Sequence, residues 1–191
     1  HPDSRVIVVK RLVGVLLGRN TAAQLKASEA LAVLSSRNSL NRQTIVQAGA
    51  IEPLVGLMGN GQRADKHTPP ERAAAVLADL SRIGESKVLI ARAGGIQPLV
   101  TMLASTCEES QTHALCALRY LSVSVENKVA IVLYGGISRV VTLLSTGNVE
   151  GQRHAAATLY QLATSADNKN AIVNAGGIPP LVGLAMKPDD F

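Results

Sequence analysis

A basic or titratable side chain recurs in this sequence at a nearly constant spacing. Lys26, Arg72, His113 and His154 follow one another at intervals of 46, 41 and 41 residues. If the fold repeats at the same interval, the four groups form a row that could hold an acidic or phosphorylated segment of another protein. The alternative interpretation is that they are ordinary solvated residues on an exposed helix face.

The same residues give little support to catalytic or metal chemistry. Cys116 lies one helical turn from His113, but a Cys-His nucleophile needs an activated thiolate and a third orienting group, and no oxyanion-stabilising motif accompanies the pair. His113 and His154 have no convergent Cys, Asp or Glu beside them and make a poor zinc site. We therefore expect no catalytic residue, no metal, no cofactor and no small-molecule substrate, and we do not expect an enzyme.

Composition narrows the class of protein. The chain of 191 residues is 47% apolar and 17% charged, which indicates a globular fold, and only 2% of its residues are aromatic, so the core must consist of Leu, Val, Ile and Ala. Cys107 and Cys116 are too few for a disulfide framework and indicate reduced thiols. We expect a cytoplasmic location, with the nucleus as an additional one.

Neither a membrane nor a nucleic acid is the expected partner. A long uncharged run, which includes Ala171 to Met186, has two glycines and two prolines at its centre, which argues against a membrane span. The net charge of +5 is carried by residues 1–42, where seven basic residues face two acidic ones, while the remaining residues balance twelve with twelve. A negatively charged partner would meet this end first, but no aromatic residues are interleaved with the basic ones, as nucleic-acid binding would favour.

A repeated glycine motif marks the elements that must position these residues. Its copies are QAGAIEPLV from Gln47, RAGGIQPLV from Arg92, LYGGISRVV from Leu133 and NAGGIPPLV from Asn174. Their first glycines, Gly49, Gly94, Gly135 and Gly176, are 45, 41 and 41 residues apart. This spacing predicts a repeated structural unit.

Each unit is predicted to contain three helices. In the last copy, Asn168 is the expected N-cap of a short first helix, and Gly176 is expected to end it in the left-handed conformation, before prolines that suit the start of a second helix. The third helix is QRHAAATLYQLATSA from Gln152, and one of its apolar positions recurs at intervals of 46, 41 and 41 residues as Leu31, Leu77, Leu118 and Leu159. A single unit cannot cover its own apolar face, so neighbouring units must stack.

The unit of about 41 residues, its Gly-Gly or Gly-Ala turn and the Ile-x-Pro-Leu-Val that follows resemble the armadillo repeat family over nearly the whole chain. The resemblance implies an all-α fold, a right-handed α-solenoid of three-helix armadillo repeats with three full repeats flanked by partial ones. The expected single domain, residues 1–191, divides into a partial repeat 1–40, full repeats 41–85, 86–126 and 127–167, and a partial repeat 168–191.

The resemblance also implies a binding site, because family members recognise other proteins along a concave groove lined by the third helices. Import receptors of this family carry Trp, and four residues later Asn, along the groove. Here the Trp place holds Glu29, Ala75, Cys116 and Ala157, and the Asn place holds Val33, Asp79, Tyr120 and Gln161. No position matches, which argues against recognition of nuclear localisation signals.

The predicted partner groove combines these places with the basic row. It consists of Lys26, Glu29, Val33, Arg72, Asp79, His113, Cys116, Tyr120, His154 and Gln161. Among these residues, Tyr120 is the one that we favour as a direct contact, because tyrosine is common at interface hot spots.

The predicted function is a non-catalytic protein-protein interaction module that binds a partner segment in this groove. The alternative is a structural or self-assembling scaffold segment of a larger armadillo protein, such as an adaptor or the substrate-binding part of a U-box type ubiquitin ligase. Uncapped apolar ends would favour self-association. The loop from Gly59 to Pro70 is four residues longer than its counterpart, which indicates either a binding loop or a tolerated surface insertion.

Overall fold

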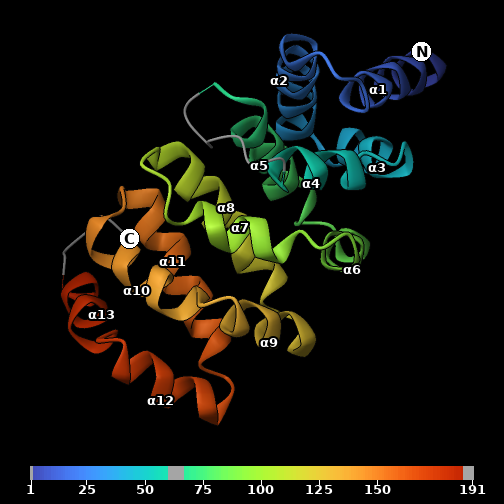
Figure 1. Cartoon of the computed structure of the whole chain (residues 1–191). Coiled ribbons are helices and arrows are strands. Elements are labelled where there is room, and N and C mark those ends of the chain that lie inside the picture. Colours follow the sequence, from blue (N-terminus) through green and yellow to red (C-terminus); the bar gives the residue numbers. More distant parts are fainter. Residues whose placement is uncertain (1, 60–66, 187–191) are drawn as a thin grey trace.

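The computed structural model describes residues 2–59 and 67–186, and all the regular elements within these ranges are α-helices (Figure 1). Residues 60–66 of the long loop lie outside the described part of the chain, so its predicted alternatives stay predictions. In the described ranges no single helix is long and apolar enough to cross a bilayer. The pair Val125–Leu133 and Gly136–Thr146 meets the length and composition together but is bent by 82°.

Each helix belongs to one of three classes, defined by its place in the unit. The first helices are α3 (Ser39–Gln47), α6 (Gly84–Arg92), α9 (Val125–Leu133) and α12 (Ala166–Asn174). The second helices are α1 (Pro2–Leu16), α4 (Ile51–Gly59), α7 (Ile96–Met102), α10 (Gly136–Thr146) and α13 (Ile178–Ala185). The third helices are α2 (Thr21–Arg37), α5 (Pro69–Leu80), α8 (Glu108–Leu121) and α11 (Val149–Leu162). Three full units are therefore flanked by the partial units α1–α2 and α12–α13, and the predicted α-solenoid is confirmed.

The third helices form the continuous spine of the solenoid. Helix α2 packs on α5, α5 on α8 and α8 on α11, and the units advance from one end of the molecule to the other without closing on themselves (Figure 1). The recurring leucines of this spine, Leu31, Leu77, Leu118 and Leu159, are all 1% exposed or less. Because burial of one leucine contributes about 1.5–3 kcal/mol, packing between neighbouring units is a major source of the stability of the array.

The turn between the first and second helices depends on the repeated glycine, as predicted. Gly49, Gly94, Gly135 and Gly176 have φ angles of 76°, 77°, 76° and 76°. Residues with a Cβ rarely adopt this left-handed conformation, so glycine allows the first helix to end and the chain to turn at once into the second.

The residue after this glycine is packed so closely that one methyl group matters. A Cβ at Gly95 would lie 2.8 Å from Ile90 Cγ2. In the first full unit the same place is held by Ala50, whose N–H donates to the Ile45 carbonyl oxygen at 3.4 Å, whereas the equivalent N···O distances at Gly95 and Gly177 are both 2.9 Å. Ala50 is thus accommodated with a longer hydrogen bond.

A second repeated contact, which we call the asparagine latch, joins a first helix to the third helix before it. In each latch an asparagine Nδ2 donates to the carbonyl oxygen of a leucine. The pairs are Asn41 with Leu34 at 2.8 Å, Asn127 with Leu121 at 3.0 Å and Asn168 with Leu162 at 3.0 Å. In α6 the corresponding residue is Ser86, whose buried hydroxyl has no hydrogen-bond partner among the described residues.

The latch corrects one expectation from the sequence. Asn168 is not an N-cap, because the N-cap of α12 is Ser165 and the helix begins at Ala166. The Asn168 amide lies inside the first turn and reaches back to α11 instead. The prediction was wrong because an asparagine near a helix start can serve either the backbone of its own helix or that of a neighbour.

Candidate protein-binding face

The third helices leave one face exposed along the array, which we call the third-helix face. Two positions of the unit are exposed or half-buried on it in every copy. The first holds Val33, Asp79, Tyr120 and Gln161, and the second, three residues later, holds Ser36, Arg82, Val123 and Thr164. Other sides of α5, α8 and α11 pack on the second helices α4, α7 and α10. Side chains at these two positions therefore reach solvent at a regular spacing.

The predicted basic row is largely occupied by contacts within the protein. Glu71, in the first turn of α5, has a side chain only 2% exposed and lies between two members of that row. Its Oε2 is 3.2 Å from Arg72 Nε, and its Oε1 is 3.2 Å from His113 Nδ1. These are ion-pair distances outside good hydrogen-bond geometry. Glu71, which no sequence pattern indicated, offsets the charge that Arg72 would otherwise offer to a partner.

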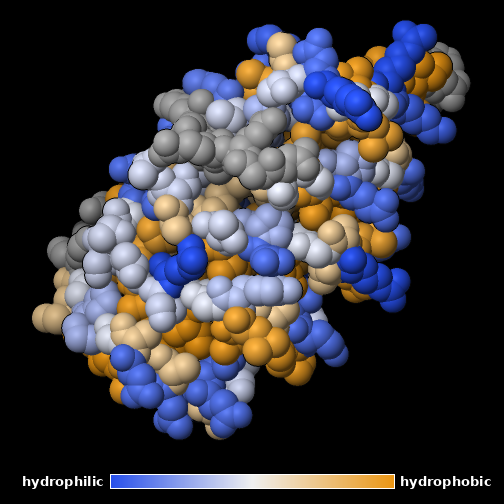
Figure 2. Space-filling view, viewed as in Figure 1, coloured by the Kyte–Doolittle hydropathy of each residue, from blue (hydrophilic) through white to orange (hydrophobic). Residues whose placement is uncertain are grey.

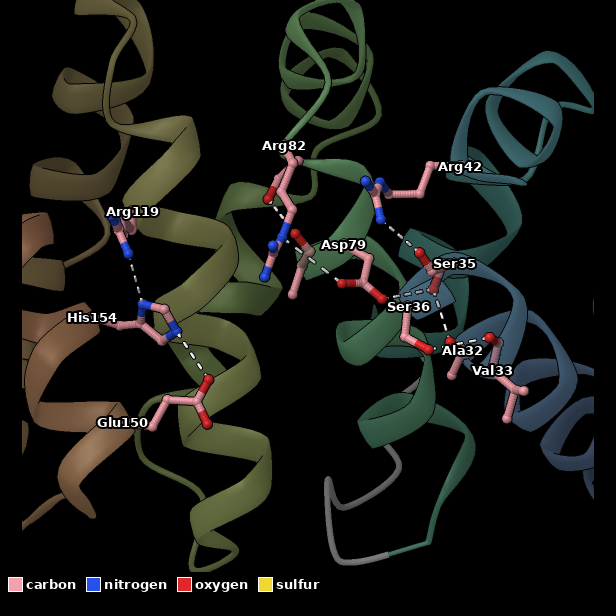
Figure 3. A network of polar contacts seen from close by, with 12 residues as sticks. Ala32, Val33, Ser35, Ser36, Arg42, Asp79, Arg82, Arg119, Glu150 and His154 are labelled. Atoms are coloured by element: carbon pink, nitrogen blue, oxygen red, sulfur yellow. Dashed lines mark hydrogen bonds and ion pairs between the residues drawn. The ribbon is translucent and has the colours of Figure 1, made fainter. Parts of the chain in front are cut away.

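His154 departs from the expected exposed row, because it is only 6% exposed. Its Nδ1 is 3.4 Å from Arg119 Nη1 and its Nε2 is 3.6 Å from Glu150 Oε1 (Figure 3). Burial lowers the pKa of His154 below its ordinary value of 6.5, and Arg119 lowers it further, while Glu150 opposes the shift. The imidazole is therefore mainly neutral at pH 7 and is not a free cation.

Cys116 is also buried, at 7% exposed, so the expectation that it faces the groove is wrong. Burial raises the pKa of its thiol, although the guanidinium of Arg82 beside it acts in the opposite direction. A thiol of this kind is protonated and weakly nucleophilic at neutral pH. Among the described residues no group of three or more His, Cys, Asp or Glu could hold a metal ion.

The structure instead gathers two arginines around Tyr120, and we call Arg82, Arg119 and Tyr120 the Arg-Tyr-Arg cluster. The guanidinium carbons of Arg82 and Arg119 lie 5.7 Å and 5.4 Å from the centroid of the Tyr120 ring. Both distances fall in the range of attractive cation-π contacts. The cluster joins the end of α5 to the last turns of α8, so it spans two consecutive units.

A polar network borders the cluster on the side of α2 (Figure 3). Asp79 Oδ2 accepts a hydrogen bond of 2.8 Å from the Ser35 hydroxyl, and Asp79 Oδ1 is 3.9 Å from Arg82 Nε. Arg42 Nη1 donates to the Ser35 carbonyl oxygen at 2.9 Å. Asp79 is thus hydrogen-bonded to Ser35 of α2, and this contact is shorter than the one that Asp79 makes with Arg82.

Comparison with known proteins identifies the repeated unit. The family model described as Armadillo/beta-catenin-like repeat matches residues 85–123 and 124–164, which contain α6–α8 and α9–α11. The chain belongs to the armadillo repeat family. Comparison with curated proteins finds no match.

Solved structures share the armadillo fold over nearly the whole chain. An engineered protein is 34% identical with a TM-score of 0.80, and the alignment covers 95% of this chain and 73% of that one. An armadillo repeat protein designed computationally for modular peptide recognition is 23% identical with a TM-score of 0.82, over 95% and 76% of the two chains. A designed armadillo repeat protein in complex with peptide (KR)4 is 24% identical with a TM-score of 0.79, over 95% and 75%. The last two likenesses show the fold.

In this armadillo array the predicted groove residues fall into separate environments. Val33, Asp79, Tyr120 and Gln161 lie on the third-helix face, as the i, i+4 spacing predicts. Lys26 is exposed and its Nζ lies 3.2 Å from Glu29 Oε2. Arg72 and His113 are held by Glu71, and Cys116 and His154 are buried. The structure adds Arg82 and Arg119 to the site, which sequence analysis missed because neither is in the i, i+4 register that it followed.

Proposed function

We propose that this armadillo array is a non-catalytic module that binds an extended segment of another protein along the third-helix face. The observation that carries the proposal is the recurrence of two solvent-reaching positions in four consecutive units, one within each third helix and one at or just after its end. Neighbouring packed helices lie about 8–10 Å apart, and an extended peptide advances about 3.3 Å per residue. Each unit would therefore meet about every third residue of the bound segment.

The chemistry of the third-helix face suits such a segment. Tyr120 is half-buried and Val123 is 55% exposed, so the face offers apolar surface beside the guanidinium groups of the cluster. Aromatic and arginine side chains carry a large part of the binding energy at protein interfaces. The designed armadillo relative that holds peptide (KR)4 supports the proposal, because it is a protein of this fold with a bound peptide.

Site-specific photo-crosslinking in cells tests this proposal. A photoreactive p-benzoylphenylalanine in place of Gln161 lies on the third-helix face, whereas the same group in place of Leu133, which is 78% exposed on α9, lies on a first helix and is the matched control. We expect adducts with a discrete partner from the first variant and not from the second. Equal adducts at both positions, or adducts only at Leu133, would place the binding surface elsewhere.

A second candidate function, a scaffold whose repeats stack on another array, is favoured by a different observation. Ile178 and Val182 of α13 are 49% and 51% exposed, although the equivalent Ile137 and Val141 of α10 are 5% and 7% exposed. Apolar side chains are also exposed on α1 at the other end, where Figure 2 shows hydrophobic and strongly hydrophilic residues side by side. The two α13 residues lie at positions that are buried in the preceding unit, where units pack on one another. An adaptor or a U-box type ligase would use the third-helix face to hold its target while the ends make such contacts.

Sedimentation velocity distinguishes the scaffold from a monomeric module. If the ends self-associate, the wild type forms larger species as its concentration rises, and Val182→Lys reduces them, because a charged side chain is costly to bury. Lys in place of the exposed Val129 of α9 is the matched control, since Val129 is 55% exposed on a first helix. A wild type that stays monomeric at high concentration would remove the support for self-association.

A further inference from the structure

We propose that the Arg-Tyr-Arg cluster is the receptor for an acidic or phosphorylated side chain of the bound segment. The inference rests on the proposed function, and it names the class of partner and the place on the third-helix face where its charge is read. Carboxylate and phosphate groups are the ligands that arginine pairs bind best, because the guanidinium presents its N–H donors in a fixed fork.

The two arginines keep much of their capacity to bind an anion. The side chain of Arg82 is 48% exposed, and its contact with a carboxylate is long, since Asp79 Oδ1 is 3.9 Å from Nε and the other oxygen of Asp79 is engaged by Ser35. The polar contact of Arg119 is with a ring nitrogen of His154 at 3.4 Å, not with a carboxylate, among the residues that the structure describes. A partner's anion would therefore not have to displace a strong ion pair.

Both arginines pack on the ring of Tyr120. Because each guanidinium carbon lies within about 6 Å of one ring centroid, the rotamers of two long side chains are restrained before a ligand arrives. The arginines come from different units, so acidic side chains bound at the cluster would fix the register of the segment against the repeats. Loss of either arginine should weaken this contact more than loss of an equal charge elsewhere.

The predicted basic row is a poorer anion receptor than the cluster. Its Arg72 and His113 face the buried carboxylate of Glu71 at 3.2 Å, and Lys26 faces Glu29 at 3.2 Å. Each of these side chains already has an acidic neighbour within the protein. The excess of positive charge on the third-helix face is therefore at Arg82 and Arg119, where one aspartate, already bonded to Ser35, accompanies two arginines.

The positive charge of the cluster also predicts that it distinguishes acidic from basic segments. A basic segment such as the peptide (KR)4, which a designed armadillo relative binds, would meet two guanidinium groups here. Like charges brought together at an interface are unfavourable, so the same surface that attracts an acidic segment rejects a basic one.

Fluorescence anisotropy with defined peptides tests the proposal. The probes are labelled peptides with four copies of Glu-Ser, of Glu-phosphoserine, of Gly-Ser and of Lys-Arg. We expect the phosphorylated peptide to bind most tightly, the Glu-Ser peptide next, and the Gly-Ser and Lys-Arg peptides weakest. The double variant Arg82→Gln, Arg119→Gln should weaken binding of the phosphorylated peptide by about 10-fold or more, and Tyr120→Leu by a smaller factor.

The matched control is the double variant Arg92→Gln, Lys169→Gln. It removes the same total charge from exposed residues of the first helices α6 and α12, and a loss below about 3-fold is expected, since only distant charge is changed. Circular dichroism and urea unfolding of all variants verify that they are folded. Equal losses in the two double variants, an unchanged affinity in the cluster variant, or tighter binding of the Lys-Arg peptide would each overturn the proposal.

Two further outcomes separate this inference from the function on which it rests. If cellular adducts form at position 161 but every acidic peptide fails to bind, the face binds partners and the cluster proposal is wrong. If a 12-nucleotide oligothymidine binds through Arg82 and Arg119 while the acidic peptides do not, the cluster recognises a nucleic acid and the peptide assignment is overturned. Loss of both the adducts and the peptide binding would remove the proposed function itself.

Discussion

The start of α9 and the start of α6 occupy the same place in consecutive units, yet they are held in different ways. At α9, Ser124 is the N-cap and its hydroxyl accepts from the Asn127 N–H at 3.4 Å, while Asn127 Nδ2 donates to the Leu121 carbonyl oxygen at 3.0 Å. At α6, the N-cap is Ile83, which has no side-chain oxygen, and Ser86 stands where α9 has its asparagine. Both helices form with nine residues.

The asparagine latch therefore adds stability to a fold that packing already determines. A short helix in water is marginal by itself, so α6 must owe its existence to the helices around it. Ile90 of α6 and Ile131 of α9 are both 0% exposed, which shows the same apolar anchor in the two units. The polar contacts at the helix starts can then vary from unit to unit.

The largest loss of stability is expected when the hydrogen bonds at the start of α9 are broken. Asn127→Ala should lower the free energy of unfolding by about 1–2 kcal/mol, because it removes a buried hydrogen bond and leaves the Leu121 carbonyl with fewer partners. Urea unfolding followed by circular dichroism measures the change. Ser86→Ala is the matched control and should change the stability by less than about 0.5 kcal/mol, since its hydroxyl makes no hydrogen bond in the described residues. Equal losses would show that the latch does not carry the difference.

Introducing an asparagine at the start of α6 should stabilise this helix start. Ser86→Asn places an amide where it can donate to the Leu80 carbonyl oxygen, as Asn127 does with Leu121, and we expect a gain of about 1 kcal/mol. A higher urea midpoint with an unchanged slope would record it. A lower midpoint would mean that the surroundings of Ser86 have no room for the larger side chain.

The N-cap of α9 should contribute less than the latch. Ser124→Ala is expected to cost about 0.5 kcal/mol, at the low end for an N-cap, because its 3.4 Å contact with the Asn127 N–H is long. Ser124→Gly should cost only a few tenths of a kcal/mol. Hydrogen exchange of the first α9 amides provides the readout, and a cost above that of Asn127→Ala would mean that the cap, not the latch, is the stronger contact.

Measuring the free energy of unfolding at several pH values separates these neutral contacts from the groups that titrate. The expected change in stability is the smallest of the four. His154 has a lowered pKa in the folded protein, so the unfolded chain binds its proton first as the pH falls, and stability should decline below about pH 6.5 toward the folded pKa. His154→Gln should flatten this decline. The difference between Asn127→Ala and Ser86→Ala should stay constant across the series, because neither residue titrates; a change in that difference would implicate a charged neighbour.

The fold could be predicted where a single residue type has no substitute. The glycines at positions 49, 94, 135 and 176 fix the turns because residues with a Cβ rarely adopt their φ angles, and their spacing therefore revealed the phase of the repeat. The recurrence of asparagine at positions 41, 127 and 168 was an equally visible signal, but its meaning was not. Whether an asparagine caps its own helix or latches a neighbour depends on which carbonyl lies nearby, and only packing decides that.

For the candidate site, the sequence predicted which helix positions reach solvent, but it did not predict which charged and titratable side chains are buried or paired. The i, i+4 register placed Tyr120 and Gln161 on the third-helix face, since it follows from helix geometry alone. Burial of His154 and Cys116 depends on how much of each helix its neighbour covers, and the burial of Glu71 depends on cations from two different units. Arg82 and Arg119 escaped notice for a related reason, because long side chains reach groups outside the register of their own backbone.

The turn at Ala50 differs from the equivalent turns of the later units. Its N···O distance to Ile45 is 3.4 Å, whereas Gly95 and Gly177 at the same place have distances of 2.9 Å, so one buried methyl group goes with a different junction between two helices. Ala50 is fully buried and lies apart from the two positions that reach solvent on the third-helix face, so this junction can vary without any change in the residues proposed to meet a partner.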